Sequence, residues 1–118
     1  MKESELALHK RYPIITLCGS TRFRDVHDEV AKELALMGYC VLTIDCFGHV
    51  DPDPRIQERK PMLDRIHLQK IDMADLIYVL DKDGYIGEST AKEIEHARKQ
   101  GKVIIYHTKD GLHRVEKP

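Results

Sequence analysis

The chain has 118 residues, which is the usual length of a single globular domain and is enough to bury one hydrophobic core. Its 19 lysines and arginines nearly balance its 20 aspartates and glutamates, and the net charge of −1 lacks the basic excess of a general nucleic-acid-binding protein. No apolar run approaches the roughly 18 residues of a membrane span, and residues 1–11 are too charged to be a signal peptide. We therefore expect one domain whose partners include neither a nucleic-acid polymer nor a membrane.

Two buried strands and an intervening helix are predicted in the first part of the chain. Residues 13–18 and 39–44 are short apolar runs without polar alternation, which is typical of strands that are buried on both faces. Between them, apolar side chains recur every three or four residues over 23–37, which indicates a helix that ends at Gly38.

A long connection, residues 45–60, follows the second strand. Loops of this length inside a compact domain usually act as lids or binding loops. His49, Asp51 and Asp53 place possible metal ligands at alternate positions of this loop, but Asp-Pro pairs are common in turns. We therefore expect a loop that covers a ligand, and neither a bound metal ion nor a cofactor.

The second half of the chain repeats the alternation of helix and strand. Helical spacing of apolar residues and short β-branched runs mark four segments. The expected order is a helix over 62–73, a strand over 76–80, a helix over 89–100 and a strand over 102–107. The polar residues at the two ends, 1–11 and 108–118, are expected to be tails.

This order of elements predicts an α/β fold of one domain spanning residues 1–118, with a parallel sheet of four to five strands and helices on both faces. Right-handed crossovers favour the strand order 2-1-3-4, in the doubly wound arrangement of flavodoxin-like and Rossmann-like proteins. Ligands of such sheets bind beyond the carboxyl ends of the strands, where the strand order reverses. We therefore expect the site at the ends of the first and third strands.

The three cysteines, Cys18, Cys40 and Cys46, include no Cys-x-x-Cys pair. Cys18 and Cys40 lie within apolar runs, where buried thiols are expected. An odd number of cysteines without a disulfide pattern is typical of a reducing compartment, so we expect the protein to be cytoplasmic.

The turn after the first strand, Gly19-Ser20-Thr21-Arg22, has the composition of an anion site. Its glycine lets the backbone approach a ligand, its hydroxyl and N–H groups lie at the positive end of a helix, and its arginine adds a fork of donors. A phosphate fits this pattern, although the spacing of a P-loop is missing. In the alternative interpretation, Ser20 or Thr21 only caps the helix.

A second group of polar residues, from Gly87 to Glu93, opens the third helix. Thr90 and Glu93 match the spacing of a capping box, which is the interpretation that the spacing alone favours. In the functional interpretation, Glu93 is a carboxylate that the helix dipole keeps ionised and that faces the ligand. Asp45, directly after the second strand, is a further candidate for ligand binding.

The second helix carries two ionisable residues, His67 and Lys70, on its apolar face. A buried histidine with satisfied hydrogen bonds and a lysine that reaches to solvent would explain them structurally. Alternatively, this face borders the ligand pocket or a subunit contact.

Two blocks of sequence follow one another in a characteristic order. The first is Leu17-Cys18-Gly19-Ser20-Thr21-Arg22, and the second runs from Ala74-Asp75 through an apolar strand to Gly87, Ser89-Thr90-x-x-Glu93, Ala97 and Gly101-Lys102. Together they resemble the nucleoside 2-deoxyribosyltransferase-like superfamily, which includes the 2′-deoxynucleoside 5′-phosphate N-hydrolases. The resemblance covers residues 13–107 and implies a doubly wound α/β domain.

The resemblance also implies a reaction, the cleavage of the N-glycosidic bond of a nucleoside or nucleotide. The nucleophilic glutamate of the family falls on Glu93, and its phosphate-binding serine and arginine fall on Ser20 and Arg22. The second carboxylate of the family falls on His67, whose usual pKa of roughly 7 would suit an acid or base. The pocket aspartate of the family is replaced by Gly87. The family is usually oligomeric, which implies a homodimer.

We therefore predict a glycosidase or deoxyribosyltransferase in which Glu93 attacks C1′ and His67 orients it or transfers a proton. A non-catalytic nucleotide-binding module of the same fold, with Glu93 only as a cap, is the main alternative. A receiver-like phosphoacceptor domain is less favoured, because it needs an acidic pair after the first strand. The residues expected to bind substrate are Gly19, Ser20, Thr21, Arg22, Asp45, Gly87, Ser89 and Thr90.

Overall fold

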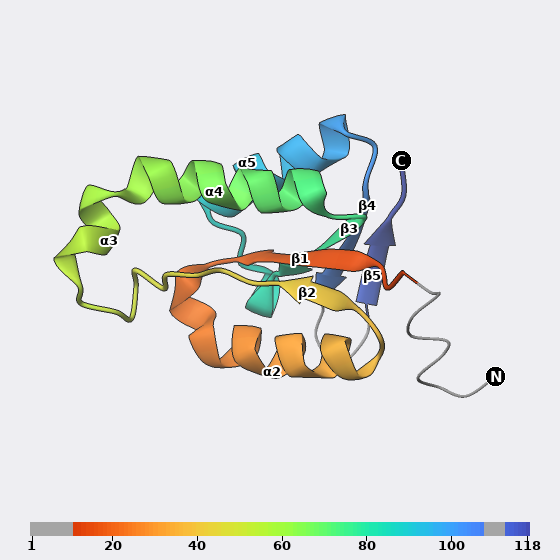
Figure 1. Cartoon of the computed structure of the whole chain (residues 1–118), viewed down its shortest axis with the longest axis horizontal. Helices are drawn as coiled ribbons and strands as arrows, with labels where there is room; N and C mark the ends of the chain where they lie inside the picture. The colour runs from red at the N-terminus through yellow and green to blue at the C-terminus, as the bar shows by residue number, and fades with distance from the viewer. Residues whose placement is uncertain (1–10, 108–112) are drawn as a thin grey trace.

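The computed structural model describes residues 11–107 and 113–118. Its centre is one five-stranded sheet with the strand order β2-β1-β3-β4-β5 (Figure 1). The first four strands are parallel, and β5 pairs antiparallel with β4. The strands are β1 (Ile14–Gly19), β2 (Cys40–Leu42), β3 (Leu76–Leu80), β4 (Val103–His107) and β5 (His113–Glu116).

The predicted order 2-1-3-4 of the parallel strands is confirmed. The central strands β1 and β3 are almost entirely buried, as their continuous apolar sequences indicated. The chain runs outward from β1 in both directions, so the strand order reverses between β1 and β3. The carboxyl ends of these two strands therefore lie side by side at one edge of the sheet.

The prediction of a polar tail over 108–118 is wrong for residues 113–116, which form the edge strand β5. Contacts of Glu116 hold this strand in place. Its carboxylate accepts hydrogen bonds from Arg98 at 2.8 and 3.0 Å and from the Tyr106 hydroxyl at 3.2 Å. A charged edge strand has no apolar pattern to reveal it, and charges at sheet edges are common in natural proteins. Most of the other predicted tail, 1–10, lies outside the described residues, as do residues 108–112.

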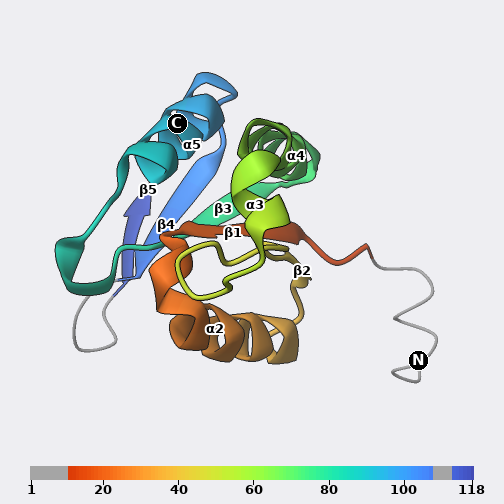
Figure 2. The same ribbon diagram turned by 90° about the vertical axis from the view of Figure 1, so that its left-hand side faces the viewer.

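Helices cover both faces of the sheet (Figure 1 and Figure 2). One face packs against α2 in a core that includes Leu17, Val30 and Leu34. The other face packs against α4 and α5 in a core that includes Ile71 and Ile94. The helices are α2 (Arg24–Leu36), α3 (Pro54–Glu58), α4 (Lys60–Met73) and α5 (Glu88–Lys99), with short 3₁₀ turns η1 (Thr21–Phe23) and η2 (Lys82–Gly84). Within the described ranges, no helix combines the length and the apolar character that a membrane span requires.

The connection 45–60 is more ordered than predicted. It contains the short helix α3, and α4 begins at Lys60 rather than at residue 62. The Asp53 side chain caps α3 by accepting a hydrogen bond from the Arg55 N–H at 3.0 Å, and Pro54 occupies the first turn. Asp53 therefore has a structural role, as the turn interpretation of this segment proposed.

The strand β2 is shorter than predicted, and one of its side chains is exposed. Cys40 is exposed, so its predicted burial is wrong, whereas Cys18 on β1 is fully buried as predicted. The difference follows from position in the sheet, because β2 pairs only with β1 and leaves one edge uncovered. Apolar content alone does not distinguish an edge strand from a central one.

Gly19 allows the sharp turn that leads from β1 into η1. Its φ is +150°, and a Cβ at this position would lie 2.9 Å from the Cβ of Leu80 and 3.1 Å from the carbonyl oxygen of Leu80. The turn therefore requires glycine both for its backbone conformation and for the close approach of β3. Ser20 then caps η1, since its hydroxyl accepts a hydrogen bond from the Arg22 N–H at 3.3 Å.

Candidate functional site

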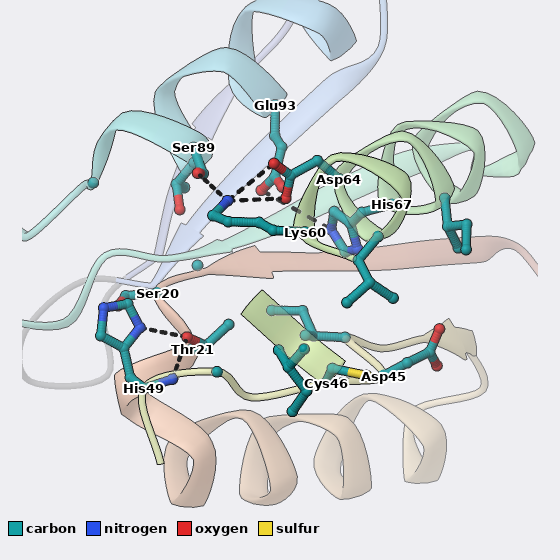
Figure 3. A pocket seen from close by; sticks show the side chains of 18 of the residues that line it. Ser20, Thr21, Asp45, Cys46, His49, Lys60, Asp64, His67, Ser89 and Glu93 are labelled. Atoms are coloured by element: carbon teal, nitrogen blue, oxygen red, sulfur yellow. Dashed lines mark hydrogen bonds and ion pairs between the residues drawn. The ribbon is translucent and has the colours of Figure 1, made fainter. Parts of the chain in front are cut away.

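A cavity of about 350 Å³ lies at the carboxyl ends of β1 and β3 (Figure 3). Its walls come from the turn after β1, the segment after β2 including α3, the helix α4, the loop after β3 and the start of α5. This is the place predicted from the reversal of strand order. The cavity brings together all of the predicted site residues except Arg22, namely Gly19, Ser20, Thr21, Asp45, His67, Gly87, Ser89, Thr90 and Glu93.

Arg22 lies outside this cavity. Its side chain is exposed, and its guanidinium carbon lies 4.5 Å from the centroid of the Tyr85 ring. Tyr85 does line the cavity, so Arg22 is stacked on a residue of the cavity wall. A Cβ added at Gly87 would lie 3.4 Å from the Tyr85 hydroxyl, an ordinary van der Waals distance, so the phenol packs directly beside position 87.

Glu93 projects from α5 into the cavity and is largely buried, with its side chain 14% exposed. Burial raises the pKa of Glu93 to about 8, and the negative charge of Asp64 raises it further. The charge of Lys60 and a hydrogen bond with Cys18 act in the opposite direction. The helix dipole does not overcome this desolvation, so Glu93 is mostly protonated at neutral pH. The prediction that it is held ionised is therefore wrong.

His67 faces Glu93 from α4, with 4.0 Å between its Nε2 and Oε1 of the carboxyl (Figure 3). Burial lowers the pKa of His67 to about 4, and the positive charge of Lys70 contributes in the same direction. The imidazole is therefore neutral near pH 7, and the expected titration near neutrality is wrong. His67 is both a buried histidine and a residue of the cavity wall, so the two sequence-based interpretations are compatible.

Cys18 completes the group around Glu93, and the sequence analysis missed its place in the site. Its sulfur lies 3.6 Å from Nε2 of His67. Burial raises the pKa of the Cys18 thiol well above its ordinary value, and the neighbouring Glu93 adds to this effect. Cys18 belongs to an apolar strand, and nothing in that pattern separates it from an ordinary core thiol.

Lys60 and Asp64 form a second polar group in the cavity that sequence analysis missed. The Lys60 ammonium lies 2.9 Å from Oδ2 of Asp64 and 3.5 Å from the Ser89 hydroxyl (Figure 3). The two residues are four positions apart at the start of α4, a spacing that pairs opposite charges on one helix face. That spacing was the available signal, but it is common on solvated helices and does not by itself indicate a site.

The segment after β2 is fixed to the rest of the cavity wall by the side chains of Thr21 and Lys70. The hydroxyl of Thr21 bonds to Nδ1 of His49 and accepts a hydrogen bond from the His49 N–H at 3.3 Å (Figure 3). Lys70 donates to Oδ2 of Asp45 at 2.6 Å and to the carbonyl oxygen of Thr43 at 2.7 Å. Lys70 therefore has a structural explanation, since it ties α4 to this segment rather than reaching to bulk solvent.

The predicted capping box at Thr90 and Glu93 is absent. The N-cap of α5 is Gly87, with no side-chain cap, and Thr90 is a buried residue inside the helix. The spacing matched by coincidence, because the helix begins three residues earlier than a cap at Thr90 requires. Glu93 is consequently free of a capping role, and its side chain belongs to the cavity.

Comparison with known proteins adds no family assignment: no family model matches the chain, and no curated protein matches it. The interpretation of the cavity therefore depends on its own geometry and chemistry.

Proposed function

We propose that this protein cleaves the N-glycosidic bond of a nucleoside or a nucleoside 5′-monophosphate, with Glu93 as the nucleophile. The observation that carries the proposal is the position of the Glu93 carboxyl, which is buried in a cavity at the point where the strand order reverses. We further infer that the fold is of the doubly wound, Rossmann-like kind. The strand order and the presence of helices on both faces support this inference.

The reactive form of Glu93 is the carboxylate. With a pKa of about 8, roughly a tenth of the molecules carry it at pH 7. A carboxylate that is desolvated in this way is a stronger nucleophile than one in water, because its charge is poorly neutralised. Burial mainly determines the fraction of Glu93 that is ionised, and the charges of Asp64 and Lys60 adjust this fraction in opposite directions.

The proposed reaction proceeds by two displacements at C1′ of the sugar. A Glu93 oxygen forms a bond to C1′ while the bond from C1′ to the base nitrogen breaks, and the bonding electrons leave with the base. Water then attacks C1′, releases Glu93 as a carboxylate, and leaves the sugar hydroxyl on the original face. The proton that the water loses passes through solvent to the departed base. A second base in place of water would give transfer instead of hydrolysis. His67, which is neutral, packs against Glu93 and serves as a positioning residue.

The turn at Ser20 and Thr21 is the proposed binding place for the 5′-phosphate. Both residues line the cavity next to the start of η1, and the hydroxyl and backbone N–H groups of such a turn suit an oxyanion. Arg22 is proposed to act at the rim, since it is stacked on Tyr85 rather than pointing into the cavity. A phosphate bound here would fix the distance from the sugar to Glu93.

A nucleotide-binding module without catalysis is the second candidate, and one observation favours it. At neutral pH most of the Glu93 carboxyl is protonated, so it is able to donate a hydrogen bond to a ligand rather than attack it. In that case the protein would bind nucleotides and release no base.

We also propose a cytoplasmic homodimer. Three cysteines without a disulfide support a reducing compartment.

The proposed dimer contact is an apolar stripe on α4. The side chains of Met62, Ile66 and Met73 are exposed apolar groups on this helix, and helical spacing places them along one stripe. Sedimentation of the wild type and of the double variant Met62→Glu, Ile66→Glu tests this assignment. The wild type should sediment as a dimer, and the variant should sediment as a monomer.

The test of the reaction is incubation with nucleosides and 5′-monophosphates of each common base, as ribose and as deoxyribose forms. Chromatography then detects the free base. Release by the wild type and not by Glu93→Gln supports the glycosidase. Binding by calorimetry without any release supports the binding module.

A further inference from the structure

Three different metal-binding side chains meet in the buried wall of the cavity. The sulfur of Cys18, Nε2 of His67 and a carboxylate oxygen of Glu93 all lie within 4.8 Å of one another. The distance from sulfur to nitrogen is 3.6 Å, and that from nitrogen to Oε1 of Glu93 is 4.0 Å. Zinc bonds of about 2.3 Å to sulfur and about 2.0 Å to nitrogen place tetrahedral ligands about 3.5 Å apart. The sulfur and the nitrogen already have this separation, and the nitrogen and Oε1 of Glu93 need to approach by about 0.5 Å. The widest separation in the group, up to 4.8 Å, needs to shorten by about 1.3 Å around a zinc ion.

We propose that Cys18, His67 and Glu93 bind a zinc ion, and that bound zinc inhibits the reaction by occupying the Glu93 carboxylate. The binding site stands on geometry alone, whereas the inhibition rests on the function proposed above. A carboxylate oxygen that donates its electron pair to zinc cannot at the same time attack C1′. Zinc and substrate would thus compete for one side chain.

The donor set selects zinc over the hard cations of the cell. A thiolate and an imidazole are poor ligands for Mg²⁺ and Ca²⁺, which take oxygen ligands. One thiolate, one neutral imidazole and one carboxylate carry a total charge of −2, so a divalent ion makes the buried group neutral. The thiol and carboxyl protons pass to the buffer when the metal binds.

The cavity gives the ion a route to this group and an open coordination position. His67 and Glu93 line the cavity, while Cys18 lies behind them in β1 with no exposed surface. Three protein ligands leave the fourth position of a tetrahedral ion facing the cavity, where water would bind. Among the described residues, no second group of three such ligands is found.

The metal site is tested by calorimetric titration of the full chain with zinc chloride under reducing conditions, and by the absorption of the cobalt(II) form. We expect one ion per chain and a thiolate-to-cobalt charge-transfer band. Cys18→Ser should weaken zinc binding by at least roughly 100-fold and remove the band. Loss of a group that only hydrogen-bonds to a metal ligand already lowers the metal affinity by roughly 10- to 100-fold. Cys46→Ser is the matched control, because Cys46 lines the same cavity but is not a ligand. It should bind zinc as the wild type does.

Two results would overturn the metal site: no zinc uptake by the wild type, or equal uptake by Cys18→Ser. Thermal melting shows whether the variant is folded, and Cys18→Ala provides a second variant if the serine is not tolerated.

The inhibition is tested by the ratio of the rate of base release with zinc to the rate without zinc. The ratio should fall for the wild type and for Cys46→Ser, and should stay near one for Cys18→Ser. Unchanged release by cobalt-loaded or zinc-loaded wild type would contradict the inhibition. Absence of release in metal-free buffer would contradict the proposed function and leave the binding result standing.

Discussion

Nε2 of His67 lies 4.0 Å from Oε1 of Glu93, yet the two side chains do not form an ion pair at neutral pH. Burial lowers the pKa of His67 to about 4 and raises that of Glu93 to about 8. Between these values the imidazole and the carboxyl are both mainly neutral. The short distance therefore reflects packing of two desolvated groups, and an attraction between charges does not hold them together.

The first prediction concerns the pH dependence of base release, measured in EDTA so that no metal occupies the site. The pKa of Glu93 is about 8, so release should rise roughly fivefold between pH 7 and pH 8 as the carboxylate forms. A rate that is flat or falls over this interval would contradict the nucleophile assignment. The groups facing Glu93 are Cys18 on β1 and Lys60, Asp64 and His67 on α4.

Two of these neighbours offer opposite controls. Asp64→Asn removes a negative charge and should shift the titration of Glu93 to lower pH, while Lys60→Met removes a positive charge and should shift it to higher pH. Carbon-13 NMR of the Glu93 carboxyl reads both shifts without relying on turnover. Arg65→Met, an exposed change on the same helix, should leave the titration in place.

The second prediction is that Glu93→Gln stabilises the fold at neutral and alkaline pH. The pKa of Glu93 rises from 4.5 to about 8 on folding, so its contribution to stability is complete below pH 4.5 and is lost as the pH rises through about 8. At pH 7, keeping this carboxyl protonated lowers the free energy of unfolding of the wild type by on the order of 3 kcal/mol. Glutamine does not ionise, so the variant lacks this penalty. Denaturant unfolding of both proteins should give a difference that shrinks toward pH 4.5. A variant that is less stable than the parent at pH 8 would refute this.

The third prediction concerns the turn that forms one wall of the cavity. Gly19→Ala should destabilise the protein by roughly 2–4 kcal/mol, because the φ of +150° is unfavourable for alanine and the new Cβ meets Leu80 at 2.9 Å. Gly101→Ala is the matched control. Its φ of +68° is also positive but no atom lies within 4 Å, so a cost of only about 1 kcal/mol is expected. If urea unfolding shows that both variants lose the same free energy of unfolding, the close approach of β3 to Gly19 does not contribute to the cost of Gly19→Ala.

The fourth prediction is a preference for 5′-monophosphates over the matching nucleosides. Arg22→Ala should reduce this preference by roughly tenfold or more, as expected for loss of one charge-assisted contact. Arg24→Ala is a close control, since Arg24 is also exposed and lies over an aromatic ring, that of Phe47. Calorimetry on both variants gives the comparison. If nucleoside and nucleotide bind the wild type equally, the phosphate site is absent.

The sequence was sufficient to predict the parallel strands, their order and the edge of the sheet where the cavity lies. Continuous apolar runs marked β1 and β3 as strands, and the preference for right-handed crossovers placed them at the centre of the sheet. Polar residues after those strands marked the edge of the sheet where the cavity lies. The strand β5 could not be found in this way. Its residues are mainly polar, and Glu116 is held by Arg98 and Tyr106, which are close only after folding.

The electrostatics of the site were not predictable, because they depend on burial and on contacts between distant segments. The pKa values of Glu93 and His67 are shifted mainly by desolvation, which no spacing in the sequence reveals. The sequence around Cys18 is that of an ordinary buried strand and does not indicate a site. Its proximity to His67 arises from the packing of α4 on β1. Thr90 and Glu93 matched a motif whose meaning depends on where the helix begins, and that point was misplaced.

The most direct test of the central claim is base release by the wild type and by Glu93→Gln, assayed near pH 8 in EDTA on a panel of 5′-monophosphates. Glutamine keeps the size of the side chain but has no ionisable oxygen, so it separates chemistry from packing. The proposed mechanism predicts that the wild type releases free base, whereas Glu93→Gln binds the same nucleotide and releases none. Equal release by the two proteins, or no release by the wild type from any nucleotide that it binds, would contradict it.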